Sequence, residues 1–581
     1  MYDRKKIAIW ILLGACVLLA SQPVLAAYLY YGHDLQFHLN RIEGIKESLQ
    51  AGIFPVRMHY ETLGGAGYPV SVFYGDALLY IPALLRILGC SVQLSYQIYI
   101  VMINTLTSVI MYKVLKNIFK DEWIGIIGTF IYIMAPYRLE CIYLRAAVGE
   151  YTALCFYPLI VYALYRIYRD KEDLNKYNWL YLSIGFSGLI LSHIISTFCA
   201  FVLTAIVCLI NFKSTFKKQI LCKLIKAVLL TLGICAGFLV PFADYMLSGV
   251  MKSDIAASGS YVKHTITLSQ LLSVFPHGRG CAYPMPDEIY MDLEMTYAMG
   301  GTGTVCLIIY LFCLFYLDSK KDKIDKLGNA VFGFSILVIW MATSYFPWKI
   351  LERLGGIFIY VMYYIQFPWR FLGAAAVLIS FTATALIYKI GSLRNNNIYY
   401  GLVISLVVLT YISGNYIMTD YMTLKKMHIV QESDVDRYNI GAGEYLPEGA
   451  VTNYEGIIVA DEKVTIVLME RDEMVYYVEC MNLTRDEQKI QLPIINYKNY
   501  HAKDLETGEE LAIEQGEECR IKITLPGGYC GKIAVEYSSP WYWRLSEMIS
   551  GITIVGVLFV FLEGLCRKKE IRFKEREKYV I

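Results

Sequence analysis

The sequence lacks the motifs that carry much of soluble enzyme chemistry. It has no Walker A motif, no glycine pattern of a dinucleotide-binding fold and no Gly-x-Ser-x-Gly turn. ATP-driven transport and serine hydrolysis therefore have no support. A sequence repeat with a period of about 20–50 residues is also missing.

Paired cysteines are missing as well. None of the 15 cysteines stands at CxxC spacing, which argues against a zinc or thiol-redox site. Most of them are single residues within apolar segments, where cysteine acts as a small hydrophobic side chain. Three lie in a later polar segment, and a disulfide between two of them stays open: Cys480, Cys519 and Cys530.

Charge of either sign is scarce, and apolar residues are abundant. The net charge of +2 indicates no nucleic-acid partner. Hydrophobic residues make up 56% of the chain and mean hydropathy is +0.44, whereas soluble domains have about 45–50% apolar residues. The excess forms many runs of about 18–25 residues, the length that crosses a bilayer. The sequence therefore predicts a multi-spanning membrane protein.

Basic residues predict the topology because they mark cytoplasmic loops. They occur in every second gap between apolar runs, beginning with Arg4-Lys5-Lys6 and ending with Arg567-Lys568-Lys569. This pattern predicts about twelve spans in the plasma membrane, with both termini in the cytoplasm. The first apolar run is long and shows no small-residue cleavage site, so we expect an uncleaved anchor.

The predicted fold is an all-α polytopic membrane protein with a small extracytoplasmic β domain before the last helix. Residues 1–418 form the membrane domain, with long outer loops at 31–94 and 244–295. Residues 419–543 alternate between polar and apolar positions with frequent turns, which is typical of a β-sandwich. Residues 544–581 hold the last span and a basic tail. The apolar stretch from Asp76 to Leu88 is short for a span, so we expect an interfacial or re-entrant helix there, a true span being the alternative.

The stretch just after the first span is the most informative one. Asp34, His38 and Arg41 are spaced i, i+4, i+7, which places them on one side of a helix. They border an apolar stripe formed by Leu35, Leu39, Ile42 and Leu49, which we expect to face lipid. This combination suits chemistry at a membrane surface. The alternative is that Asp34 caps the helix and the other two residues form a solvated face.

Ionisable residues near a membrane often mark a functional path. Arginine matches phosphate oxygens with two donors, and a carboxylate can act as a general base on a hydroxyl. On the predicted outer side, these residues point to transfer from a lipid-bound phosphate: Asp34, His38, Arg41, Arg138, Glu140, Arg145, Glu150, His193, His277, Arg279 and Arg370.

Each of these residues also has a plainer interpretation. Arg138 with Glu140, and Arg145 with Glu150, could be interfacial ion pairs, and His193 could be a histidine at a helix end. The turn that holds His277 and Arg279 could simply be flexible. Trp369 beside Arg370 is typical of an interfacial aromatic belt. The acidic residues of 287–294 could bind a divalent metal with Asp34, although their spacing matches no defined metal loop.

Several short motifs carry a resemblance to known families. His33-Asp34, Gly52-Ile53-Phe54-Pro55-Val56-Arg57 and Gly65-Ala66-Gly67-Tyr68-Pro69 resemble the bacterial membrane family labelled "6-pyruvoyl-tetrahydropterin synthase-related". Gly443-Glu444-Tyr445-Leu446-Pro447 and the closing sheet resemble the YfhO-like family. The architecture as a whole resembles the GT-C glycosyltransferases, which use polyprenyl-phosphate-linked sugars.

The GT-C resemblance implies roles for two acidic residues. Asp34 would be the catalytic acid/base, and Glu150 would be the second acidic residue. Asp34 is followed by Leu35, so the Asp-Glu or Asp-x-Asp pair of some GT-C branches is absent, and the resemblance does not settle metal dependence.

The leading hypothesis is therefore a membrane glycosyltransferase acting on a lipid-linked sugar donor and an extracytoplasmic glycan, lipid or protein acceptor. The alternatives are a transporter or flippase of a lipid-linked or polymeric glycan, and a non-catalytic protein of envelope assembly. A transporter would carry charges in mid-span and inverted repeats, and the sequence shows few of the former and none of the latter.

Overall fold

A computed structural model describes residues 2–169, 177–248, 265–275, 295–317, 322–392, 396–452, 456–472 and 474–578. The chain divides into two compact units. Unit 1 comprises Met1–Ile220, Lys252–Leu446 and Val451–Gly456. Unit 2 comprises Leu221–Met251, Pro447–Ala450 and Ile457–Ile581.

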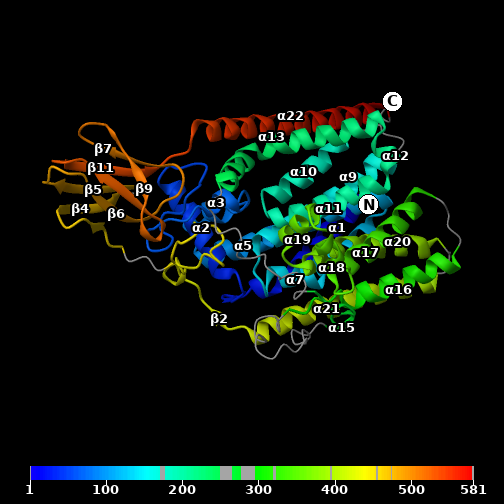
Figure 1. The fold of residues 1–581 in the computed structure, drawn as a ribbon. Coiled ribbons are helices and arrows are strands. Elements are labelled where there is room, and N and C mark those ends of the chain that lie inside the picture. The colour runs from blue at the N-terminus through cyan, green and yellow to red at the C-terminus, as the bar shows by residue number, and fades with distance from the viewer. Residues whose placement is uncertain are drawn as a thin grey trace. The chain divides into compact units, whose positions relative to one another are not determined.

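Unit 1 is a bundle of helices (Figure 1). Its helices are α1 (Tyr2–Ala20), α2 (Leu35–Gln50), α3 (Val70–Phe73), α4 (Tyr80–Ile87), α5 (Val92–Phe119), α6 (Glu122–Ile133), α7 (Pro136–Ile142), α8 (Val148–Leu154), α9 (Tyr157–Arg169), α10 (Trp179–Ile190), α11 (Ile194–Ile210), α12 (Phe212–Thr215), α15 (Leu268–Leu271), α16 (Gly300–Tyr316), α17 (Lys323–Ala342), α18 (Trp348–Leu354), α19 (Ile357–Ile365), α20 (Phe371–Gly391) and α21 (Asn396–Leu424).

The described residues of both units contain seven helices long and apolar enough to cross a membrane, or eight if the bent pair α6–α7 is one span. The chain is thus a multi-pass membrane protein, but the predicted count of about twelve spans is not confirmed. Apolar runs end early where a helix breaks. For example, α10 has 12 residues, which extend over about 18 Å of the roughly 30 Å hydrocarbon layer.

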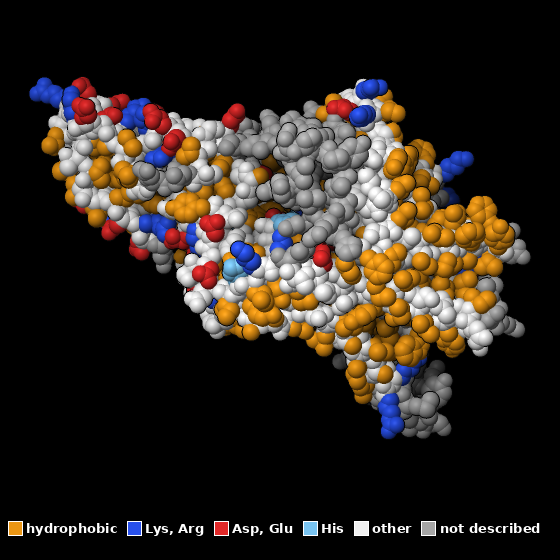
Figure 2. Space-filling view, turned by 90° about the horizontal axis from the view of Figure 1, so that it is seen from below, with side chains coloured by type: hydrophobic (Ala, Val, Ile, Leu, Met, Phe, Trp, Pro, Cys, Tyr) orange, Lys and Arg blue, Asp and Glu red, His pale blue; other side chains and the backbone are white. Residues whose placement is uncertain are grey.

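Helix α20 is the centre of unit 1. In its most apolar stretch of 18 residues, 94% of the residues are buried inside the protein, whereas the corresponding share for α21 is 33%. Small residues allow neighbouring helices to approach closely, as is typical of membrane bundles. A Cβ added at Gly128 of α6 would lie 2.3 Å from Thr384 of α20, and the Ser380 hydroxyl donates to the Gly128 carbonyl at 2.6 Å. Exposed hydrophobic side chains gather over the helices on the face shown in Figure 2.

The segment predicted to be the first outer loop, residues 31–94, contains helices α2, α3 and α4. With only eight residues, α4 is too short to cross a bilayer, so a true span at Asp76–Leu88 is wrong. The apolar stripe of α2 is buried within unit 1, where α2 packs against α4 and α5. Leu35, Leu39 and Ile42 are each at most 1% exposed. The expectation that this stripe faces lipid is therefore wrong, because protein covers it.

A segment after α21 returns to this loop. We call residues 427–446 the strap. Strand β2 (Met427–His428) of the strap pairs antiparallel with β1 (Leu29–Tyr30). Further along, Glu432 bonds Arg86 and Lys46, each at 2.6 Å. These contacts tie the strap to α2 and α4, far away in the sequence.

Unit 2 combines two long helices with two antiparallel sheets (Figure 1). Helices α13 (Lys218–Ser248) and α22 (Trp541–Lys578) lie side by side, and the Gly237 amide donates to the Ser550 hydroxyl at 2.8 Å. One sheet has the order β3-β6-β10-β9 and the other β4-β5-β11-β7-β8. The strands are β3 (Val459–Ala460), β4 (Val464–Asp472), β5 (Val475–Asn482), β6 (Gln488–Ile495), β7 (Tyr500–Asp504), β8 (Glu510–Leu511), β9 (Ile513–Gln515), β10 (Arg520–Leu525) and β11 (Cys530–Tyr537).

Both sheets lie within residues 419–543, the segment predicted to be β. The domain boundaries drawn from the sequence stay a prediction. Cys480, Cys519 and Cys530 are free, so the disulfide left open by the sequence is not formed among them. Cys530 pairs in register with Met481, the neighbour of Cys480. Because successive side chains alternate between faces, Cys480 and Cys530 point to opposite sides of the sheet.

Candidate functional site

Asp34 is held by backbone contacts at the start of α2. Its amide donates to the Arg145 carbonyl at 2.8 Å, and the amide of His33 donates to the Leu144 carbonyl at 2.9 Å. The approach requires glycine at position 32, where an added Cβ would lie 2.5 Å from the Tyr143 carbonyl oxygen. These contacts bring the beginning of α2 against the loop between α7 and α8.

The Asp34 side chain does not cap α2, so the plainer interpretation of this residue is wrong. Among the described residues, no donor makes a hydrogen bond to its carboxylate, which is half-buried. Burial raises the pKa of the Asp34 carboxyl, against the lowering effect of Arg145, His33 and Arg370. The carboxylate is thus more basic than that of an ordinary aspartate, and its oxygens accept no hydrogen bond from the described residues.

Glu150 and three residues around it form what we call the Arg145 cluster: Tyr137, Arg145, Glu150 and Arg370. Arg145 Nη1 donates to Glu150 Oε2 at 2.6 Å, and the Tyr137 hydroxyl donates to Glu150 Oε1. Arg370 Nε lies 3.9 Å from Glu150 Oε2 and has no hydrogen-bond partner among the described residues. The cluster therefore holds two guanidinium groups around one carboxylate, beside Asp34.

Aromatic rings support both arginines. The Arg145 guanidinium lies 4.6 Å from the Trp369 ring centroid, and that of Arg370 lies 4.9 Å from Phe367. Trp369 is only 5% exposed. The prediction that Trp369 lies in an interfacial belt is therefore wrong, since its ring is buried in unit 1 and packs against the Arg145 guanidinium.

His38 and Arg41 form a second group with Tyr74. Arg41 Nη1 lies 3.1 Å from His38 Nδ1, and Arg41 Nη2 donates to the Gly75 carbonyl at 3.2 Å. The Arg41 guanidinium stacks on the Tyr74 ring at 4.1 Å. Burial and the charge of Arg41 hold the pKa of His38 well below its usual value. His38 is therefore neutral at physiological pH, and the solvated face offered as an alternative is wrong because both residues are buried.

The other predicted residues fall in different places. The His193 ring lies 5.8 Å from Tyr74, and its Nδ1 accepts from the Ser196 amide at 3.2 Å, so His193 caps α11 next to this group. Arg138 binds α5 instead, donating to Asn104 Oδ1 at 2.7 Å. Glu140 accepts from the Thr296 amide at 2.5 Å. Arg138 and Glu140 thus have separate partners, and the proposed ion pair between them is not found among the described residues.

Two predicted residues, His277 and Arg279, lie outside the described residues, as do the acidic residues of 287–294. Within the described ranges, no group of three His, Cys, Asp or Glu side chains could hold a metal ion. The metal alternative, which needs the residues of 287–294, stays a prediction.

Two residues near the site, Tyr74 and Glu444, were not among the predicted site residues. The Tyr445 ring stacks on Phe73 with centroids 4.7 Å apart, which fixes the end of the strap. The neighbouring Glu444 carboxylate acts electrostatically on Asp34 and Arg370. The Gly443-Glu444-Tyr445 motif was visible in the sequence, but nothing in its spacing linked it to residue 34.

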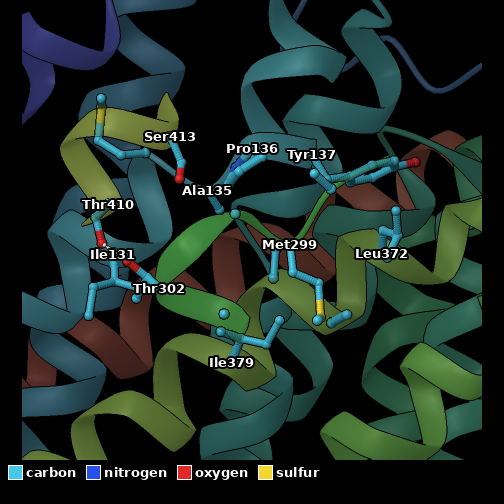
Figure 3. Close-up of a pocket in the computed structure, with 16 residues that line it drawn as sticks. Ile131, Ala135, Pro136, Tyr137, Met299, Thr302, Leu372, Ile379, Thr410 and Ser413 are labelled. Carbon is cyan, nitrogen blue, oxygen red and sulfur yellow. Dashed lines mark hydrogen bonds between the residues drawn. The ribbon is translucent and has the colours of Figure 1, made fainter. Parts of the chain in front are cut away.

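A small cavity of about 30 Å³ lies next to the Arg145 cluster (Figure 3). Its lining is largely apolar, with a hydrogen bond between the Thr302 and Thr410 hydroxyls at 2.7 Å. Tyr137 stands at its edge with the hydroxyl pointing away from Thr302. The cavity is too small for a sugar, since it holds about one or two water molecules.

No family model and no curated protein sequence matches this chain. Solved structures do show a likeness. The apo form of the Archaeoglobus fulgidus oligosaccharyltransferase matches at 12% identity and a TM-score of 0.40, covering 71% of this chain and 55% of that one. The same archaeal protein tethered with an acceptor peptide containing the NVT sequon matches at 14% identity and a TM-score of 0.39, over 72% and 55% of the two chains.

The arabinofuranosyltransferase AftD from mycobacteria matches at 12% identity and a TM-score of 0.42, covering 74% of this chain and 28% of that one. This chain therefore spans about half of the archaeal protein's length and under a third of the mycobacterial one's. Both proteins are named as enzymes that transfer sugars, the class that the sequence resemblance implied. Similarity at this level carries no argument about the site or the reaction of this chain.

Proposed function

We propose that this protein is a membrane glycosyltransferase that moves a sugar from a polyprenyl-phosphate-type lipid donor to an extracytoplasmic acceptor, a glycan, lipid or protein of the cell envelope. One observation carries the proposal. The Asp34 carboxylate accepts no hydrogen bond from any described residue and lies beside a buried cluster with two arginines. A free base next to an anion-binding group is what sugar transfer from a lipid phosphate requires.

The proposed step is a displacement at the anomeric carbon of the sugar. Asp34 takes the proton of the acceptor hydroxyl, and the acceptor oxygen forms a bond to the anomeric carbon of the sugar. The bond between that carbon and the phosphate oxygen breaks, and the phosphate leaves with the bonding electron pair. Arg145 and Arg370 face the charge that develops on the phosphate.

The geometry suggests a supporting role for Glu150. Both of its carboxylate oxygens accept hydrogen bonds, from Arg145 and Tyr137. A carboxylate engaged in this way is a poor base, because its charged form is stabilised by its partners. We therefore propose Glu150 as the residue that positions Arg145, with Asp34 as the catalytic base.

His38 would position Arg41 as Glu150 positions Arg145. Because the His38 ring is neutral, it cannot itself offer a positive charge to phosphate. Arg41 already has the Gly75 carbonyl and the Tyr74 ring as partners. This second group therefore shapes the site from the side of α2 rather than binding the phosphate directly.

The test is transfer from a radiolabelled polyprenyl-phosphate sugar by purified protein in nanodiscs, with an envelope extract as acceptor. We expect Asp34→Asn to reduce the rate by about 100-fold or more, the usual contribution of a general base. Glu352→Gln, an exposed carboxylate on α18, serves as the matched control and should retain the wild-type rate. Equal rates for Asp34→Asn and wild type would refute the proposal.

The transporter alternative makes the opposite prediction in the same nanodiscs. A flippase moves the labelled lipid between leaflets without forming a new glycosidic bond. Lipid translocation without a transferred sugar would favour that alternative over the enzyme.

A further inference from the structure

A hollow at His33, the residue before Asp34, is lined by lysine and histidine side chains that the proposed reaction does not use. Its volume is about 420 Å³, within the size range of ligand sites. We call it the His33 pocket. Its lining residues are Tyr31, Gly32, His33, Lys425, Lys426 and His428.

Tertiary structure creates this pocket from two distant segments. The antiparallel pairing of Leu29 with His428 and of Tyr30 with Met427 joins its two walls. The Tyr421 hydroxyl donates to the Tyr30 carbonyl at 2.6 Å. The Tyr31 and His428 rings meet edge to face with centroids 4.4 Å apart. The walls are therefore fixed by the fold before any ligand binds.

The depth of the pocket follows from α21. The membrane-crossing segment of that helix ends at Thr423, so Lys425 and Lys426 follow directly at the level of the lipid headgroups. Lys426, His33 and His428 are exposed and Lys425 is half-buried. Figure 2 shows histidine side chains beside Lys and Arg side chains on the face drawn there. Two lysines and two imidazoles around one hollow are suited to an anion.

We propose that the His33 pocket binds the phosphate group of an anionic lipid at the outer membrane surface, with Lys425 and Lys426 as the charged contacts. Lysine binds phosphate as a point charge, and each lysine near an anionic surface adds appreciably to the affinity. The neighbouring residue Asp34 would then stand next to a bound lipid headgroup. Lysines that only point to the interface would bind anionic lipids weakly and without preference for this pocket.

The test measures lipid retention rather than turnover. The protein is placed in phosphatidylcholine nanodiscs with increasing phosphatidylglycerol, and the lipids that stay bound are counted by native mass spectrometry. We expect Lys425→Gln with Lys426→Gln to weaken phosphatidylglycerol binding by about tenfold or more. The double variant Lys425→Arg with Lys426→Arg keeps the charge and should keep the binding, which separates charge loss from misfolding.

The control is Lys349→Gln, an exposed lysine on α18 outside the pocket. Wild-type phosphatidylglycerol affinity in the double glutamine variant, or an equal loss in the Lys349 control, would overturn the proposal. In a second arm, inorganic phosphate is titrated against the detergent-purified protein and its melting temperature followed. Stabilisation by inorganic phosphate without retention of phosphatidylglycerol would assign the same pocket to a soluble phosphate.

This proposal stands apart from the proposed transferase. Asp34→Asn should bind phosphatidylglycerol at least as tightly as the wild type does, because the pocket's lysines are untouched and a negative charge near the headgroup is removed. Wild-type protein that retains phosphatidylglycerol but transfers no sugar would thus refute the enzyme and leave the pocket in place.

Discussion

The guanidinium of Arg145 donates to the carboxylate of Glu150 at 2.6 Å, and both side chains are at most about a tenth exposed. A buried pair of this kind contributes little net stability by itself, but breaking it is costly. It fixes the direction of Arg145, whose other face lies on Trp369. The pair therefore sets the geometry of the site more than the stability of the fold.

Glu150→Gln should destabilise the protein because it leaves the buried Arg145 without its counter-charge. We expect a loss of about 3–5 kcal/mol, seen as a large fall in the melting temperature in nanodiscs. Tyr137→Phe is the control: it removes one hydrogen bond to the same carboxylate and should cost about 1 kcal/mol. Equal melting temperatures for the two variants would mean that the ion pair is not important for the structure.

Asp34→Asn should raise the melting temperature at neutral pH while slowing transfer by about 100-fold or more. The pKa of Asp34 is raised by burial in the folded protein, so the folded state binds its proton more tightly than the unfolded chain does. The ionised carboxylate therefore costs stability above the raised pKa, and this cost disappears as the pH falls through it. Melting curves of both proteins at several pH values test this. A stability difference that grows on acidification would contradict it.

As the pH is lowered, the rate of transfer by the wild type should begin to fall at a higher pH than it would with a base of ordinary aspartate pKa. Asp34 must be ionised to accept a proton from the acceptor. Because burial raises its pKa, Asp34 becomes protonated, and the rate falls, at a higher pH than for an ordinary aspartate. The rate profile with pH for transfer by purified protein gives the measurement. An acid limb at or below the usual aspartate value would exclude Asp34 as the titrating base.

Arg41→Lys should lower both stability and transfer although it keeps the charge. A lysine ammonium cannot contact the Gly75 carbonyl, His38 Nδ1 and the face of Tyr74 at the same time, as the Arg41 guanidinium does. We expect a fall of several degrees in the melting temperature and about tenfold slower transfer. Arg353→Lys on exposed α18 is the matched control and should change neither.

Gly44→Ala tests the packing of α2 against the segment around His59 that follows it. A Cβ at position 44 would lie 2.1 Å from His59 Nδ1, and His59 is buried. We expect a loss of about 1–3 kcal/mol from overpacking. Gly333→Ala, also within a helix, meets nothing within 4 Å and should cause no loss. A melting temperature unchanged by Gly44→Ala would contradict the close packing of His59.

The sequence predicted local features well where periodicity decides them. Strand alternation identified the β segment, because a half-buried strand exposes every second side chain. The spacing of His38 and Arg41 placed them together, and they do lie 3.1 Å apart. The suggested pairing of Arg145 with Glu150 is also confirmed, although the pair is buried rather than interfacial.

Other expectations failed because apolar content does not say what covers a surface. The apolar pattern of Leu35, Leu39 and Ile42 would be the same whether lipid or protein covered it. In the structure, protein covers these side chains. The predicted count of about twelve spans is not confirmed among the described residues, because the number of spans depends on where helices break, as between α6 and α7, and hydropathy does not locate such breaks.

The sequence by itself determined that the chain crosses a membrane repeatedly and that Asp34 begins a helix with His38 and Arg41, because both follow from short-range spacing. Only the tertiary structure decided what surrounds Asp34. The Arg145 cluster reaches it through the loop between α7 and α8, and the lysines at 425 and 426 come to the neighbouring His33 through the pairing of β1 with β2. Such contacts join residues far apart in the chain, so no local pattern records them, and they form only when the whole unit packs.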